Sequence, residues 1–401
     1  MTEETPVLLT EPRDGLPDVI EDDDALQTAL EAVAAGHGPV AIDAERASGY
    51  RYGHRAYLVQ LRRAGAGTFL IDPLGVPDLT ALGEAIGDAE WVLHAASQDL
   101  PCLSDIGMWP AALFDTELAG RLLGLPRVGL GPLVESVLGF HLEKGHSAAD
   151  WSTRPLPEAW LRYAALDVEL LIELRDALEA QLRDSGKLEW AQEDFAAIVA
   201  APPPEPRADP WRRTSGVHRV RDRRGLAVVR QLWLERDDLA RIRDISPGRI
   251  LPDAAIVDAA LSQPATAADL AKLPVFKGRA QRRELNRWFG AIAAARALEK
   301  EDLPPQTARY DGPPPARSWA SREPEAAARL AAARNALSEI AEQHSLPVEN
   351  LLTPDTLRRV VWNPPEPPTV ETVAAAFRER GAREWQIRLT ARAVAEALTA
   401  P

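Results

Sequence analysis

Apolar and polar positions recur with two different periods along this chain, and the period changes near residue 200. Before that point, short apolar runs predict β-strands at residues 39–43, 57–61, 68–72 and 91–94. A 3.6-residue spacing predicts α-helices at residues 79–86, 117–123, 130–138 and 157–183. Strands interleaved with helices in this way predict an α/β layered domain.

Beyond residue 200 the apolar spacing is helical throughout, and proline-rich segments separate the parts. Residues 202–206 and 304–315 have the composition of stiff linkers, whereas the prolines at 364–368 fall inside the last unit. The expected division is an α/β unit at 1–200, a linker at 201–211, and helical units at 212–302 and 317–401.

The composition is that of a folded protein without a membrane span. The chain has 401 residues, of which 46% are hydrophobic and 26% charged, and no run approaches 18 apolar residues. Residues 1–24 are acidic and lack the pattern of a secretory signal. A single cysteine, Cys102, excludes an intramolecular disulfide and a cysteine-cluster zinc site. We therefore expect a cytoplasmic protein.

Charge is distributed unevenly along the chain. The whole chain has a net charge of −14, yet residues 212–300 carry 19 Lys and Arg against 10 Asp and Glu, a net of +9. Such a basic segment is typical of a phosphate-binding surface, and it is also typical of a solvated helical face. Charge alone does not separate these two interpretations.

Two acids lie at the end of the first apolar run: Asp43 is its last residue, and Glu45 follows two positions later. Residues two apart in a strand point to the same face, so the two carboxylates would repel each other unless a cation lies between them. A divalent cation with oxygen ligands fits that position. The same pair taken alone is more often simply a polar strand end.

Three further residues could join this pair. Asp99 follows the strand at 91–94 and would lie in the first turn of a helix that begins near Ser97, where an acid also suits the helix dipole. Tyr163 and Asp167 are four apart and share one face of a largely apolar helix. A buried Asp is costly unless it is paired or binds a metal, so the alternatives here are a ligand or a Tyr–Asp hydrogen bond in the core.

The order of these motifs, D-x-E, H-x-x-x-x-D and Y-x-x-x-D, resembles the DEDDy branch of the 3′–5′ exonucleases, with the closest likeness to the ribonuclease D family. The resemblance covers about residues 18–185 and implies an α/β ribonuclease H-like exonuclease domain, a mixed sheet with flanking helices. The connecting segments that share it are Tyr57–Leu61, Leu70–Leu74, Phe114–Thr116 and Asp150–Leu156.

The later units carry a likeness of their own. Residues 237–253 and 268–274 resemble the helicase-and-RNase-D C-terminal (HRDC) domain, and residues 326–398 resemble a diverged second copy. The implied architecture is the exonuclease domain followed by two small all-α HRDC-type domains. No P-loop occurs in the sequence, which excludes a helicase motor in this chain.

The resemblance implies phosphodiester hydrolysis with two divalent cations, for which Mg²⁺ is expected and Mn²⁺ could substitute. Asp43 would bridge both cations, and Glu45 and Asp167 would complete the site of the cation that activates water. Asp99 would hold the second cation, and Tyr163 would position the attacking water. All five would be catalytic residues.

Three other residues are expected to bind substrate. His94 and Gln98 flank the Asp99 motif and could contact the terminal nucleotide, although a histidine at a strand end is also often simply buried. Lys144 could reach a backbone phosphate, or it could be an ordinary loop residue.

The acids do not distinguish RNA from DNA, because both carry phosphates. The resemblance implies 3′ trimming of tRNA precursors and other structured RNAs with release of 5′-mononucleotides, while the basic HRDC unit holds the RNA. Two alternatives stay open: a DNA 3′–5′ exonuclease of the Werner or proofreading kind, and an inactive fold that serves as an RNA-binding scaffold. No membrane partner is expected; the oligomeric state is open, with a monomer as the expected form.

Overall fold

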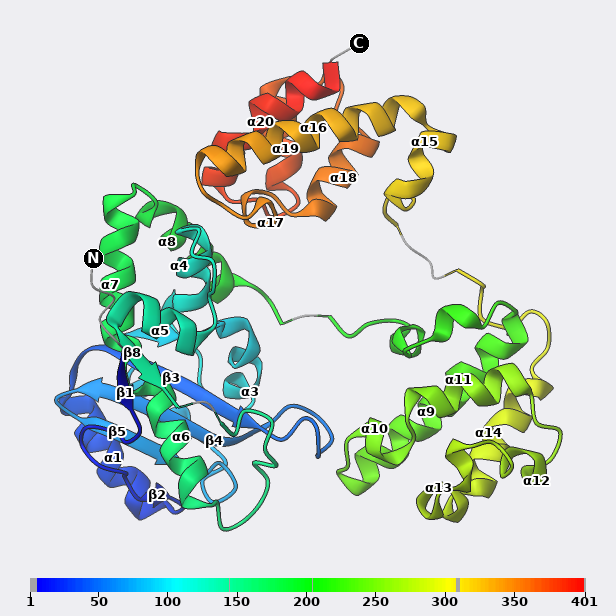
Figure 1. The fold of residues 1–401 in the computed structure, drawn as a ribbon, viewed down its shortest axis with the longest axis horizontal. Coiled ribbons are helices and arrows are strands. Elements are labelled where there is room, and N and C mark those ends of the chain that lie inside the picture. Colours follow the sequence, from blue (N-terminus) through cyan, green and yellow to red (C-terminus); the bar gives the residue numbers. More distant parts are fainter. Residues whose placement is uncertain (1–5, 144, 204, 308–310, 400–401) are drawn as a thin grey trace.

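The computed structural model describes residues 6–143, 145–203, 205–307 and 311–399. The first part of the chain forms an α/β domain around a six-stranded sheet, and the described parts after it are helical, as the sequence predicts (Figure 1). The strands are β1 Val7–Leu9, β2 Val19–Ile20, β3 His37–Arg46, β4 Ala56–Ala64, β5 Gly67–Ile71, β6 Glu90–Leu93, β7 Ala112–Asp115 and β8 Phe140–Leu142.

The main sheet is mixed and has the order β2-β5-β4-β3-β6-β7, while β1 and β8 form a separate parallel pair. β3 lies inside the sheet, antiparallel to β4 and parallel to β6. Its residues Val40, Ala41 and Ile42 are fully buried, as a continuous apolar run in an interior strand requires. The strand continues to Arg46, so Asp43 and Glu45 lie within β3 and not in the loop after it.

Helices flank this sheet. α6 packs across β3, β4 and β5, α7 packs against β3 and β6, and α8 packs against β7. The single helix predicted at residues 157–183 is in fact two, because the chain leaves helical geometry at Leu170 and turns from β3–β5 toward β6. The helices of this domain are α1 Asp23–Ala35, α2 Thr80–Ala85, α3 Leu100–Ser104, α4 Thr116–Leu122, α5 Leu130–Leu138, α6 Glu158–Glu169, α7 Leu171–Asp184 and α8 Leu188–Ala200.

The middle helical region has a hydrophobic core of its own, centred on the fully buried Trp288, Leu232, Ile256 and Phe276. Its helices are α9 Arg223–Arg243, α10 Pro247–Ile250, α11 Asp253–Ser262, α12 Ala267–Leu270, α13 Arg279–Arg283 and α14 Leu285–Ala297. Short 3₁₀ helices of the chain are Ala96–Gln98, Pro210–Arg213, Val217–Arg219, Val275–Lys277 and Ala316–Ser318.

This middle region contacts the loop that joins β3 to β4, which reaches toward α10 (Figure 1). The guanidinium of Arg249 donates to the Gly49 carbonyl at 2.8 Å and lies 4.2 Å from the ring centroid of Tyr50. The hydroxyl of Tyr52 donates to Asp237 at 3.1 Å. The loop that begins at the end of β3 is therefore held from outside its own domain.

The last region shares a continuous core with the α/β domain. Trp385 stacks on Trp190 of α8 with ring centroids 5.0 Å apart and an interplanar angle of 8°. Arg383 pairs with the buried Asp194 of α8 at 2.9 Å. Its helices are α15 Trp319–Arg322, α16 Pro324–Gln343, α17 Val348–Leu351, α18 Pro354–Trp362, α19 Val370–Arg378 and α20 Glu384–Thr399.

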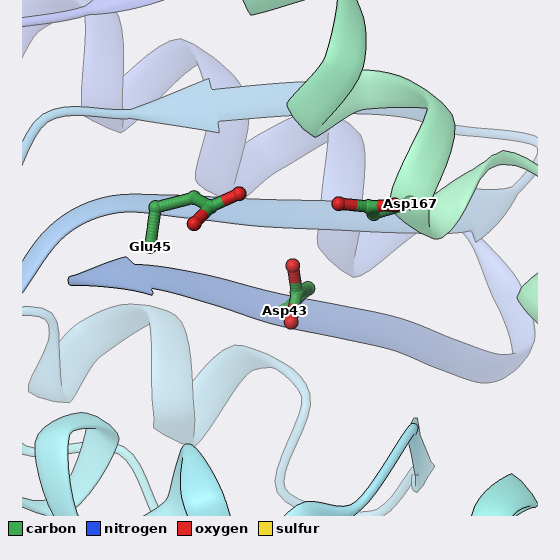
Figure 2. Close-up of side chains that lie close together, drawn as sticks. All are labelled: Asp43, Glu45 and Asp167. Atoms are coloured by element: carbon green, nitrogen blue, oxygen red, sulfur yellow. The ribbon is translucent and has the colours of Figure 1, made fainter. Parts of the chain in front are cut away.

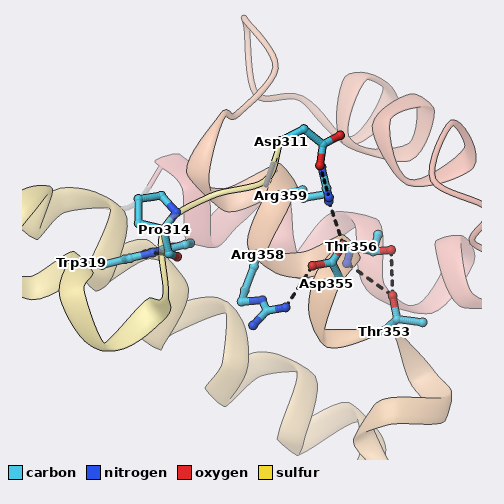
Figure 3. Close-up of polar contacts among 8 residues, drawn as sticks. All are labelled: Asp311, Pro314, Trp319, Thr353, Asp355, Thr356, Arg358 and Arg359. Atoms are coloured by element: carbon cyan, nitrogen blue, oxygen red, sulfur yellow. Dashed lines mark hydrogen bonds and ion pairs between the residues drawn. The ribbon is translucent and has the colours of Figure 1, made fainter. Parts of the chain in front are cut away.

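The segment that leads into this last region is fastened to it (Figure 3). The indole of Trp319 donates to the Pro314 carbonyl at 2.7 Å, and Arg359 reaches back to Asp311 at 3.1 Å. Arg359 also binds Asp355 in the first turn of α18. Exposed ion pairs of this kind contribute little each, so the buried indole is the principal anchor.

No helix in the described residues is long and apolar enough to cross a membrane.

The two cores lead to a test of which parts unfold together. Trp385 and Trp288 are both fully buried, so replacing either with Ala should cost about 3–5 kcal/mol. Trp385→Ala should speed amide hydrogen exchange in α8 as well as α20, because these helices share one core. The matched control, Trp288→Ala, should speed exchange in the helices of the middle core, among them α9, α11 and α14, and leave α8 and α20 as in the wild type. Unchanged protection of α8 in Trp385→Ala would show that the shared core does not couple the two regions.

Candidate active site

Three carboxylates meet over the middle of the sheet (Figure 2). Asp43 and Glu45 extend from the same face of β3, as their two-residue spacing predicts, and Asp167 approaches them from α6. One oxygen from each lies within 4.8 Å of the other two, a spacing that a cation can bridge. This donor set of hard oxygens fits a divalent cation.

Asp99 comes from the other side of the pocket, at the junction of the 3₁₀ helix and α3. It is buried, but it is not part of the three-carboxylate group. Its Oδ1 lies 3.0 Å from Nη2 of Arg46, and Nη1 of Arg46 donates to the Gln98 carbonyl at 2.6 Å. Arg46 thus pairs with Asp99, and its charge also favours ionisation of Asp43 and Glu45, a role that we did not predict. The signal was present in the sequence, since a basic residue directly follows D-x-E.

The carboxylate of Asp115, on the next strand, stabilises the turn that leads to Asp99. Asp115, at the end of β7, accepts hydrogen bonds from the backbone N–H groups of Ala95 at 3.1 Å and Ala96 at 2.9 Å. It also caps α4 by accepting from Glu117 and Leu118. Ala95 has a positive φ of 59°, which a β-branched residue would adopt only with strain. In the sequence, Asp115 stands out only as part of a connecting segment.

Burial and mutual repulsion disfavour ionisation of these acids. Burial, reinforced by repulsion from Asp43, raises the pKa of Glu45 to about 10. The same two causes raise the pKa of Asp99 to about 8, against the opposing effect of Arg46. Burial also raises the pKa of Asp43 and of Asp167. A divalent cation would hold all four ionised, because its charge offsets both the lost hydration and the repulsion.

Tyr163 lies one helical turn before Asp167 on α6 and hydrogen-bonds its carboxylate. Burial and the neighbouring acids raise the pKa of the Tyr163 phenol above its usual value. The hydroxyl therefore stays protonated, which suits it to orient a water molecule and not to take a proton from one.

The acids line a cavity of about 430 Å³ that also receives His94 and Gln98. Nδ1 of His94 lies 2.9 Å from the hydroxyl of Thr116, and burial lowers the pKa of the imidazole to about 4. Gln98 is exposed at the cavity wall. Of the eight residues expected in the site, seven line this cavity; the eighth, Lys144, lies outside the described residues.

Three family models match consecutive parts of the chain. The model described as "3'-5' exonuclease" matches residues 17–183, and the HRDC domain model matches residues 225–292. A model described as "3' to 5' exonuclease C-terminal domain" matches residues 312–398. The HRDC-like character of this last part stays a prediction, since its match is to a different model.

Relatives and solved structures agree with these matches. The chain is 37% identical to ribonuclease D of Gluconacetobacter diazotrophicus over 69% of this chain and 71% of that protein. The crystal structure of Escherichia coli RNase D, an exoribonuclease involved in structured RNA processing, covers 95% of this chain and is itself covered to 98%, with 27% identity and a TM-score of 0.70. A crystal structure of a Bifidobacterium adolescentis protein shares 41% identity over 98% of this chain and 100% of its own, with a TM-score of 0.90.

The sequence motifs, the shared pocket and these matches lead to one conclusion: the chain belongs to the ribonuclease D family, and its activity is that of a 3′–5′ exoribonuclease.

Proposed function

We propose that the acidic pocket trims the 3′ ends of tRNA precursors and other structured RNAs and releases 5′-mononucleotides. The observation that carries this is the convergence of three carboxylates within 4.8 Å beside a protonated tyrosine, in a chain of the ribonuclease D family. The structured-RNA role of the Escherichia coli relative supports the choice of substrate. A direct test is digestion of an end-labelled tRNA with a 3′ extension, which reads both polarity and product.

The residues take the roles that their positions suggest. Asp43 would contact both of two divalent cations, Glu45 and Asp167 would complete one cation site, and Asp99 would hold the other. Such cations supply a nucleophile and neutralise the phosphate when bound; Mg²⁺ is the proposed ion, with Mn²⁺ as a substitute. Tyr163 would then hold the attacking water in line through its hydroxyl.

Two other interpretations receive less support. A DNA exonuclease of the Werner or proofreading kind is not favoured, because the matched relatives are ribonucleases. An inactive scaffold is not favoured either, because all five signature residues line one cavity.

We further propose the division 1–200, 212–302 and 317–401 with a linker at 201–211, of which residues 1–5, 144, 204 and 400–401 lie outside the described part. The middle unit would hold RNA through its basic surface, and the protein would act as a cytoplasmic monomer.

Neutralising Asp43 separates cation binding from folding. Asp43→Asn removes one of several buried like charges, so the variant in EDTA should be at least as stable as the wild type. Added Mg²⁺ or Mn²⁺ should raise the melting temperature of the wild type and leave that of the variant unchanged. Calorimetric scans with and without the cation measure both. Nuclease activity of the wild type in excess EDTA would contradict the cation assignment.

Tyr163→Phe tests the role of the hydroxyl. The change removes one oxygen and little volume, so folding and RNA affinity should persist. Loss of water positioning should lower kcat by about 10²-fold or more. Single-turnover digestion gives the rate, and a binding titration under chelation gives the affinity. Wild-type rates in this variant would make Tyr163 a purely structural partner of Asp167.

The basic surface is best tested in the full chain, because deleting the C-terminal region would expose the core that it shares with the α/β domain. Arg279, Arg282 and Arg283 are exposed on α13. Changing all three to Gln should weaken tRNA binding. The salt dependence of binding should also flatten, by about 0.7 for each phosphate that the variant no longer neutralises.

A matched control removes the same charge from the C-terminal region, where Arg322, Arg334 and Arg392 are exposed. Changing these three to Gln should leave the salt slope nearer the wild-type value. Equal losses of affinity in both triple variants would mean that net charge, and not the α13 surface, governs binding.

A further inference from the structure

His94 is the one histidine among the residues that line the acidic cavity. It directly follows β6 and so lies at the carboxyl end of that strand, and Asp99, five residues later, lines the same cavity. Two hydrogen bonds behind its ring determine which of its nitrogens carries the proton.

The hydroxyl of Thr116 has a single proton and two neighbours that could take it. It is completely buried and lies 3.2 Å from the Leu93 carbonyl, to which it donates. Its oxygen is then an acceptor for Nδ1 of His94 at 2.9 Å, so Nδ1 carries the hydrogen. In a neutral imidazole the other nitrogen, Nε2, must then be an acceptor. The lowered pKa of His94 agrees with a neutral ring at physiological pH.

Two of the charged side chains around the cavity already have partners. Arg46 is bound to Asp99 and to the Gln98 carbonyl. Glu117 binds Arg121 at 2.6 Å. Among the residues that the structure describes, no protein group donates to Nε2 of His94, which leaves a partly buried neutral acceptor within the cavity.

A hydroxyl group of the substrate is the donor that suits such an acceptor. The 2′-hydroxyl is also the group by which a protein can distinguish RNA from DNA at a given position. We propose, on the basis of the function assigned above, that Nε2 of His94 accepts a hydrogen bond from the 2′-hydroxyl of the 3′-terminal ribose. His94 is thereby a specificity residue for RNA, separate from the carboxylates that promote hydrolysis.

Two variants test the roles of Nδ1 and Nε2 of His94 separately. In His94→Asn the side-chain amide can replace Nδ1 as the donor to Thr116 but does not reach the position of Nε2. In His94→Gln the longer side chain can place its carbonyl oxygen near that position. Each is compared with the wild type on RNA oligonucleotides that end in a ribonucleotide, a 2′-deoxynucleotide or a 3′-deoxynucleotide, with kcat/KM as the readout and thermal unfolding as the check on folding.

The wild type should lose about 2- to 10-fold in kcat/KM when the terminal 2′-hydroxyl is removed, the effect of one neutral hydrogen bond. In His94→Asn that loss should disappear, since the acceptor is gone. In His94→Gln it should be retained in part. A merely structural role for His94 would lower all rates and leave the ratio between ribo and 2′-deoxy ends as in the wild type.

The proposal is overturned if the ratio of kcat/KM between the ribonucleotide end and the 2′-deoxynucleotide end is the same in the wild type and in His94→Asn. It is also overturned by a loss of discrimination against the 3′-deoxy end in place of the 2′-deoxy end, which would assign Nε2 to the 3′-hydroxyl. If His94→Asn does not fold, ¹⁵N NMR of the wild-type histidines decides: AMP, but not 2′-deoxy AMP, should shift the Nε2 signal. A wild type that releases no nucleotide from RNA refutes the proposed function, whereas trimming without the ratio change refutes this inference alone.

Discussion

The requirement to hold several carboxylates together in a buried pocket governs this structure. Two unit charges about 4 Å apart repel by about 4 kcal/mol at an effective dielectric of 20, which is a large part of the roughly 5–15 kcal/mol by which native domains are stable. Such a group cannot be carried by a mobile loop, because the loop would relax and separate the charges. The structure places Asp43 and Glu45 on an interior strand and Asp167 on a helix packed across it. The rigid sheet thus keeps the acids close until a cation offsets their repulsion.

The opposite wall of the pocket is held by hydrogen bonds and an ion pair. Asp115 accepts four backbone N–H groups and joins the end of β6 to the start of α4. That anchored turn leads to Asp99, and Arg46 then offsets part of its charge. Because Asp99 follows an anchored turn and its carboxylate pairs with Arg46, this side chain has little freedom, which is what catalytic positioning requires. Loss of Asp115 would release the turn without removing any group that contacts substrate.

Local patterns in the sequence predicted the contacts between residues that are close along the chain and missed those between residues that are far apart in it. The pairing of Asp43 with Glu45 and of Tyr163 with Asp167 follows from strand and helix periodicity, which acts over a few residues. The contact of Arg46 with Asp99 spans more than fifty positions, so the basic residue after D-x-E does not by itself reveal its partner. The break at Leu170 is likewise a tertiary effect, since the helical spacing continues through it and only the change of packing partner ends the helix. Four of the described strands, β1, β2, β7 and β8, were not predicted, since each has only two to four residues and a run that short is not identified reliably by its pattern.

The basic middle region contacts the acidic α/β domain through the β3–β4 loop. A pocket of carboxylates repels the polyanion that it must cut, so attraction has to come from nearby. The β3–β4 loop follows Arg46, which lines the pocket. Two residues of the basic region bind this loop: Arg249 contacts the Gly49 carbonyl, and Asp237 accepts from Tyr52. The exposed pairs of Arg51 and Arg55 with Asp244 add little to this contact, whereas the arginine stacked on Tyr50 also binds the backbone of the loop. The strand that carries Asp43 and Glu45 is therefore joined, through the loop that follows it, to the basic middle region.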